Sequence, residues 1–198
     1  GPLCTPLDLL ADGQLEALFQ RIERDWGELD LVLHSIAFAP KEDLQGRVVD
    51  CSKQGFLLAM EVSCWSFLRM AKLAEPLMKR GGVLFTMSYY GSQMVVENYN
   101  LMGPVKAALE AATRYMAAEL GPKGIRVHAI SPGPLKTRAA SGITEFDRLL
   151  QKAQTKAPAR SLVSIDDVGI AVGFLATDAA KLITGETLYI DGGYHIID

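Results

Sequence analysis

The chain has 198 residues, of which 49% are hydrophobic and 22% are charged. This composition excludes a disordered chain, a coiled coil, a collagen-like protein and a disulfide-stapled miniprotein, and no apolar run is long enough to span a bilayer. The net charge is −3 and no basic stretch is clustered, so we expect neither a nucleic-acid nor a membrane partner. Cys4, Cys51 and Cys64 form no C-x-x-C pair, which is typical of reduced thiols in a cytoplasmic enzyme.

Apolar periodicity predicts strands and helices in alternation. The first helix is expected to be capped by Asp12 and ended by Gly27, and the last helix to begin with a capping box at Ser164 and Asp167. The run at 29–36 is largely apolar, as expected of a parallel strand covered on both faces. In chain order the expected elements are a strand end at 3–9, a helix at 12–26, strands at 29–36 and 83–88 around a long helix at 52–78, a helix at 101–120, a strand at 125–130, helices at 145–152 and 165–176, and a strand at 188–190.

This alternation predicts right-handed crossovers and hence an α/β fold with a doubly wound, Rossmann-like parallel sheet. We expect residues 1–198 to form a single domain, since no repeat or linker divides them. Ligands in such sheets bind beyond the carboxyl ends of the strands.

Tyr99 and Lys106 are the most informative pair of residues. On a helix, seven steps of about 100° bring the two side chains within roughly 20° of each other, so both can face one site. A nearby ammonium favours the ionised form of a phenol, which would lower the pKa of Tyr99 from its usual value of about 10. A reductase needs such a pair to meet negative charge that builds on its substrate. Pro104 requires the helix to begin near 101–103. The pair alone also fits an unrelated aromatic residue and a solvated lysine.

The pattern Tyr99-x6-Lys106 after Ser88-Tyr89, with His34-Ser-Ile-Ala-Phe-Ala-Pro40, resembles the NADH-dependent enoyl-acyl-carrier-protein reductases. These enzymes are divergent members of the short-chain dehydrogenase/reductase superfamily. Ordinary members have the spacing Tyr-x3-Lys, whereas this chain has Gly103 at that place. The resemblance continues through 114–117, 124–134, 137–143 and 191–193, so it covers essentially the whole chain.

The resemblance implies a role for each matching residue. Tyr99 would hydrogen-bond the thioester carbonyl, Lys106 would hold the nicotinamide ribose, and Tyr89 would be a second active-site tyrosine or a residue that shapes the pocket. Substrate contacts would come from Ala39, Met102 and Phe146, the last on a lid at 142–146 that could equally be a surface helix. Contacts with NAD(H) would come from Asp8, Leu9, Ser35, Ile36, Lys106, Gly133, Leu135, Lys136, Thr137, Arg138 and Ala139; Asp8 alone also fits a solvated strand end.

The implied partner is an enoyl thioester on acyl carrier protein, and the implied assembly is a homotetramer. His34, His128 and His195 are scattered, so we expect no metal, and Ser35 lacks the partners of a hydrolase triad. The chain opens where the family has its third strand, so it is N-terminally incomplete by that comparison. We expect an upstream segment of about 50–60 residues with the glycine-rich turn, without which NADH binding would be poor.

Three alternatives stay open at this point. The cofactor could be NADH or NADPH, because the second-strand residues that distinguish the two are not in the sequence. The chain could be another short-chain reductase, acting on a ketoacyl or enoyl-CoA substrate. It could also be a catalytically silent fragment that serves only in assembly or binding.

Overall fold

The computed structural model describes residues 3–135, 137 and 145–197. The strands in this part form one parallel sheet in the order β1-β2-β3-β4. They are β1 (Leu31–His34), β2 (Gly82–Met87), β3 (Ile125–Pro132) and β4 (Thr187–Ile190). The α-helices are α1 (Gln14–Trp26), α2 (Lys41–Leu44), α3 (Lys53–Met60), α4 (Ser66–Ala74), α5 (Met102–Leu120), α6 (Phe146–Lys156) and α7 (Ile165–Ala176). Short 3-10 helices lie at Val48–Asp50, Glu75–Leu77, Tyr90–Ser92, Gly121–Lys123, Asp178–Ala180 and Tyr194–Ile196.

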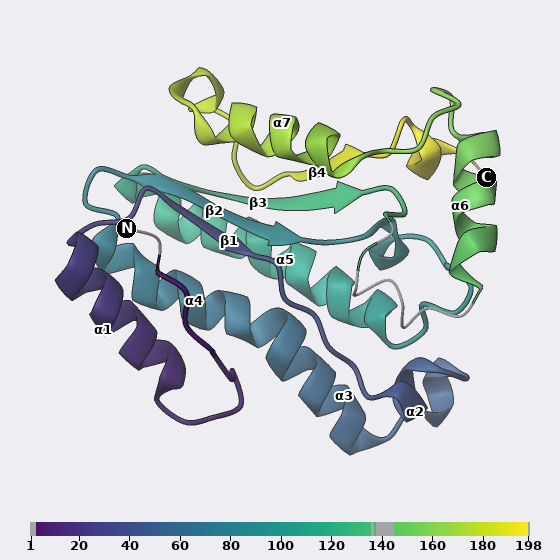
Figure 1. Ribbon diagram of the computed structural model, residues 1–198, viewed down its shortest axis with the longest axis horizontal. Helices are drawn as coiled ribbons and strands as arrows, with labels where there is room; N and C mark the ends of the chain where they lie inside the picture. Colours follow the sequence, from purple (N-terminus) through teal and green to yellow (C-terminus); the bar gives the residue numbers. More distant parts are fainter. Residues whose placement is uncertain (1–2, 136, 138–144, 198) are drawn as a thin grey trace.

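Helices cover both faces of the sheet. In Figure 1, α7 lies on one face, and α1, α4 and α5 lie on the other. The neighbouring β2 residues Leu84 and Phe85 enter opposite cores, as the alternation of side chains along a strand requires. Leu84 packs in the larger core with Leu109 of α5, and Phe85 packs in the second core with Leu175 of α7. This arrangement confirms the predicted α/β fold with a doubly wound parallel sheet.

The edge of the sheet at β1 differs from the prediction. The structure has no strand at 3–9, because a strand needs a hydrogen-bonded neighbour and, among the described residues, β1 pairs only with β2. The prediction that β1 is covered on both faces is also wrong. Leu31 and Leu33, which share one face, are 39% and 48% exposed, since the helix on that face, α7, packs against β4 at the far edge.

Glycines, rather than the predicted aspartate, delimit α1. The N-cap is Gly13 in the left-handed conformation (φ 78°), and no side chain caps the helix, so the prediction for Asp12 is wrong. Gly27 ends α1 as predicted, with φ 79° and its N–H donating to the carbonyls of Ile22 and Glu23. Glycine adopts this positive φ without a Cβ penalty.

The predicted continuous helix at 52–78 is interrupted. A π-helical turn at Glu61–Trp65 separates α3 from α4, and each such turn shifts the phase of the side chains that follow. The apolar stripe that one straight helix would present is therefore broken. Phe56 of α3 and Leu68 of α4, on the two sides of the π-helical turn, are 37% and 38% exposed.

The remaining predicted elements are found within a few residues of their expected bounds. α7 has the predicted bounds, and its capping box is present. The N–H of Asp167 donates to Ser164 Oγ (3.1 Å), and the N–H of Ser164 donates to Asp167 Oδ2 (2.8 Å). In the part of the chain that the structure describes, no helix combines the length and the apolar character needed to cross a membrane.

Candidate active site

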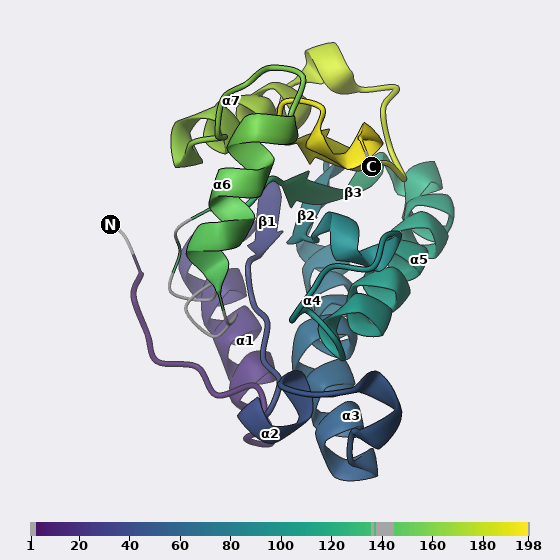
Figure 2. The same ribbon diagram turned by 90° about the vertical axis from the view of Figure 1, so that its right-hand side faces the viewer.

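The carboxyl ends of β1, β2 and β3 meet at one edge of the sheet, because the strands are parallel. Figure 2 looks onto this edge, with α6 and the C-terminal turn nearest the viewer. The segments that leave the strands here stay close to one another. The N–H of Ser88 donates to the carbonyl of Ile130 (2.6 Å), and that of Gly133 donates to the carbonyl of Ile190 (2.9 Å). Predicted site residues from three separate segments, 35–39, 88–92 and 133–135, therefore gather at this edge.

Tyr99 lies in a turn before α5, not on the helix. Asn98 and Asn100 flank it with positive φ values of 62° and 39°, a region that asparagine tolerates better than most residues. The Asn100 amide donates to the carbonyl of Leu44 (2.8 Å) and ties this turn to α2. The start of α5 at Met102 confirms the limit set by Pro104. However, the helical spacing argument for the pair is wrong, since only Lys106 is helical.

The segment after β2 brings the pair together instead. The ring of Tyr99 lies across the ring of Tyr89, with centroids 5.0 Å apart and planes inclined by 67°. A Cβ on Gly91 would lie 2.6 Å from Cδ1 of Tyr99, so only glycine lets this ring approach the backbone. Lys106 Nζ donates to the carbonyl of Met87 at 2.7 Å. Tyr99 and Lys106 thus converge on the residues around Tyr89.

Lys106 is a buried cation, 5% exposed. Burial lowers the pKa of Lys106 to about 8, while the nearby Cys64 and Glu110 oppose this shift. An ammonium has three donors, and a single hydrogen bond from Lys106 Nζ is found within the described residues. The group can therefore donate to further hydroxyl or carbonyl oxygens.

The predicted lowering of the Tyr99 pKa is wrong. Burial raises the pKa of Tyr99, and the negative charge of Glu110 raises it further. Burial also raises the pKa of Tyr89, whose hydroxyl is enclosed without a hydrogen-bond partner among the described residues. Both phenols are therefore neutral donors near neutral pH.

Glu110 is a buried polar residue that the sequence reasoning did not single out. It is 3% exposed, and its Oε1 accepts from Ser88 Oγ (2.5 Å) and Ser92 Oγ (2.7 Å). These serines flank Tyr89 and Tyr90. The available signal was an acidic residue four positions after Lys106 in an otherwise apolar stretch of helix.

The structure places the other predicted residues around this centre in different ways. Met102 is buried in the larger core, and Ala39 and Ile36 pack against that core. Ser35 is exposed after β1. Asp8 is exposed on the turn before α1, where its Oδ1 accepts from the N–H of Leu10 (2.9 Å).

The following residues complete the predicted set. Leu9 is partly buried against the larger core, Leu135 against the second core, and Phe146 is partly buried at the start of α6. Thr137 is exposed. Lys136, Arg138 and Ala139, together with most of the predicted lid at 142–146, lie outside the described residues.

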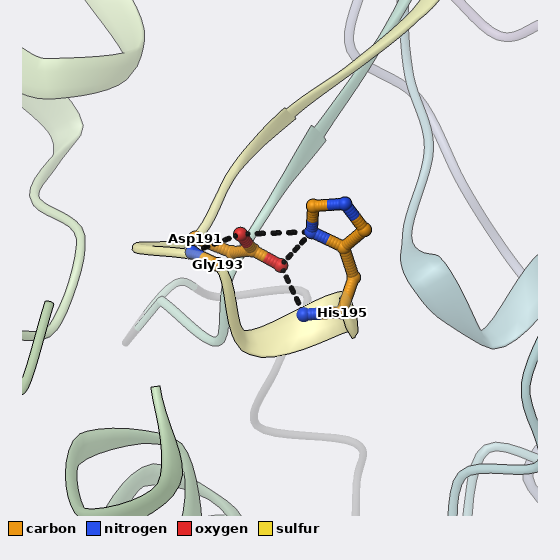
Figure 3. A network of polar contacts seen from close by, with 3 residues as sticks. All are labelled: Asp191, Gly193 and His195. Atoms are coloured by element: carbon orange, nitrogen blue, oxygen red, sulfur yellow. Dashed lines mark hydrogen bonds and ion pairs between the residues drawn. The ribbon is translucent and has the colours of Figure 1, made fainter. Parts of the chain in front are cut away.

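The space beside Gly133 is filled by residues of the C-terminal turn and of the segment before α7. A Cβ at this position would lie 3.1 Å from Cβ of Asp191 and 3.3 Å from Cγ1 of Val163. Figure 3 shows how Asp191 orders the turn: its carboxylate accepts from the backbone N–H groups of Gly193 and His195 and from Nδ1 of His195. The turn thus fixes the backbone of the segment that the resemblance assigns to the cofactor.

A pocket of about 190 Å³ opens beside this centre, between α6 and the turn before Tyr99. Tyr90 and Leu149 line it, but neither Tyr99 nor Lys106 does. Its charged lining is mixed in sign, with Glu97 and Glu145 beside Arg148 and Lys152. Among the described residues, no group of three or more His, Cys, Asp or Glu side chains is arranged to hold a metal ion.

Comparison with known proteins places this geometry in a family. Residues 2–195 match the family model described as enoyl-(acyl carrier protein) reductase. An enoyl-[acyl-carrier-protein] reductase [NADH] from Bacillus cereus is 43% identical over 98% of this chain and 76% of its own length. One from Rhizobium meliloti is 44% identical over 92% of this chain and 67% of its own length.

Solved structures agree with the sequence comparison. The Bacillus cereus enoyl-acyl carrier protein reductase, solved with NADP+ and indole naphthyridinone, superposes with a TM-score of 0.95 at 42% identity, over 98% of this chain and 75% of that one. The enzyme from Anaplasma phagocytophilum in complex with NAD gives a TM-score of 0.94 at 45% identity, with 98% and 74% covered. The chain therefore belongs to the enoyl-acyl-carrier-protein reductase family.

Proposed function

We propose that this chain reduces a trans-2-enoyl thioester carried by acyl carrier protein to the saturated acyl thioester, with NADH as the hydride donor. One observation supports this most directly: Tyr99 and Lys106 converge on the segment around Tyr89 (residues 87–92, the Tyr89 segment) at the carboxyl edge of the sheet. The names of the relatives, which specify NADH, point the same way.

The donor set of this chain fits a nicotinamide cofactor. Lys106 has ammonium donors to spare and is shielded from water, so it suits the ribose hydroxyls. When bound, the cofactor supplies a hydride to the β-carbon of the enoyl group. The C-terminal turn around Asp191 fixes the backbone at Gly133, which would hold the cofactor there.

Tyr99 acts on the other end of the reacting group. Hydride arrival at the β-carbon moves negative charge onto the thioester oxygen, and a donor aimed at that oxygen stabilises the charge. Because the pKa of Tyr99 is raised, its phenol keeps its proton and donates a hydrogen bond, rather than acting as a phenolate. The buried Lys106 adds positive charge, and the Tyr89 hydroxyl, which has no partner in the described part of the chain, is a second donor within the site.

The proposal is tested by following NADH absorbance with crotonyl and acetoacetyl thioesters, each with NADH and with NADPH. We expect the full-length protein to turn over the crotonyl thioester with NADH, and Tyr99→Phe in it to lower kcat/KM by about 10²–10⁴-fold. Preference for the acetoacetyl substrate would assign the chain to ketone reduction. NADH binding without turnover of either substrate would leave it a binding protein.

We also infer a homotetramer in the cytoplasm. The exposed apolar side chains of Trp65 on the π-helical turn, Leu68 on α4 and Tyr115 on α5 support self-association. The free thiols Cys4, Cys51 and Cys64 support a reducing compartment. Light scattering on the purified protein tests the assembly: a monomer at all concentrations would contradict it.

A further inference from the structure

We propose that Glu110 is a positioning residue of this site: its carboxylate anchors both ends of the Tyr89 segment and supplies the negative charge that keeps Lys106 an ammonium. The proposal rests on the proposed function for the roles of Tyr89 and Lys106. Its geometric basis is independent of that function, because it consists of contacts within the chain.

The first part concerns the anchoring of the segment. Ser88 follows β2 and Ser92 ends the 3-10 helix Tyr90–Ser92, so the two serines bracket the tyrosines. Both hydroxyls donate to the same oxygen, Oε1 of Glu110. Hydrogen bonds to an ionised acceptor are shorter and stronger than those between neutral groups. One side chain of α5 thereby holds the segment at two points, while Gly91 between them receives the ring of Tyr99.

The second part concerns the charge on Lys106. Glu110 lies one helical turn beyond Lys106 on α5, and no ion pair to Glu110 within 4.0 Å is found in the described part of the chain. A carboxylate that is 3% exposed and has no salt-bridge partner is costly to bury. Buried charged groups of this kind cluster at functional sites. We infer that the function of the Glu110 carboxylate is to favour the charged form of Lys106.

The titratable groups around Lys106 come from three elements. Cys64 lies on the π-helical turn, His34 ends β1, and Glu110 shares the helix. His34 is buried and neutral near pH 7, and burial raises the pKa of the Cys64 thiol. Among these three groups Glu110 is the carboxylic acid, and its Oε1 accepts both serine hydroxyls, as a carboxylate acceptor does.

The test is a titration of Lys106 by NMR, using protein labelled with ¹³C at the lysine ε-carbon and assigned with Lys106→Met. We expect Glu110→Gln to lower the midpoint of Lys106 by about one pH unit, because a neutral amide no longer favours the ammonium. Glu119→Gln, an exposed carboxylate on the same helix, is the matched control and leaves the midpoint unchanged. An unchanged midpoint in folded Glu110→Gln overturns the proposal.

Hydrogen exchange measures the anchoring. The amides of Ser88 and Ser92 are both hydrogen-bonded, to Ile130 and Tyr89, and they report on the segment. We expect their exchange to accelerate roughly tenfold in Glu110→Gln and in the double variant Ser88→Ala/Ser92→Ala. The double variant keeps the carboxylate, so its Lys106 midpoint stays near that of the wild type. Unchanged exchange in the double variant overturns the proposal even if Glu110→Gln fails to fold.

These measurements need neither cofactor nor substrate. If turnover fails while the midpoint and the exchange respond as expected, the proposed function is wrong and the role of Glu110 stands. If turnover is present, Glu110→Gln also shifts the pH profile of kcat/KM downward, and Glu110→Asp, which restores the charge, returns it toward that of the wild type.

Discussion

Replacing Gly91 by alanine gives a direct test of how the Tyr99 ring is placed. The added Cβ would lie 2.6 Å from Cδ1 and 3.0 Å from Cε1 of Tyr99, whereas ordinary contact begins at 3.4 Å. The ring or the segment must therefore move by about 0.8 Å. Gly91 does not have a positive φ, so alanine adds no backbone strain and the effect comes from this contact.

A displacement of this size is large for a catalytic group. A shift of about 1 Å can cost roughly 10²-fold in rate, and overpacking of a core costs about 1–3 kcal/mol of stability. We expect Gly91→Ala to lower kcat/KM for the enoyl thioester by about 10²-fold and to lower the free energy of unfolding in urea by about 1 kcal/mol or more. NADH affinity should change much less, because the clash involves Tyr99 rather than Lys106.

The matched control is Gly121→Ala, at the end of α5. A Cβ at Gly121 would meet nothing within 4 Å, and the residue has φ −53°, so the added methyl group is accommodated. We expect wild-type activity for this variant. Wild-type kcat/KM and stability in Gly91→Ala would show that the ring is not confined by this glycine, and would refute the reasoning.

Further changes probe the fold that supports the site. Ser164→Ala removes the capping box of α7 and should cost about 1 kcal/mol in urea unfolding; no loss would mean that Asp167 alone caps the helix. Burial lowers the pKa of His34 to about 4, so the unfolded chain takes up its proton first as pH falls below 6.5; His34 should contribute about 3 kcal/mol of stability that is lost between pH 7 and 4, and His34→Gln should flatten this dependence. Gly133→Ala would place its Cβ 3.1 Å from that of Asp191 and should lower the melting temperature by several degrees; an unchanged value would show that the C-terminal turn yields freely.

The sequence by itself determined the fold class and the family. Alternating apolar periods predict a parallel α/β sheet because each element must bury one face, and capping residues such as Ser164 and Gly27 act within a few residues of themselves. The motif order from His34 to Gly193 identifies the family without coordinates.

The tertiary structure decided how the site is assembled. Tyr99 and Lys106 are not joined by helical spacing but by a segment from β2, a contact that no local pattern encodes. The clash that requires glycine at Gly91, the anchoring by Glu110 and the raised pKa of Tyr99 all depend on residues distant in sequence that meet only after the sheet forms. Burial and electrostatic fields are properties of the packed chain. They raise the pKa of Tyr99, whereas the Tyr99–Lys106 pair alone predicts a lowered pKa.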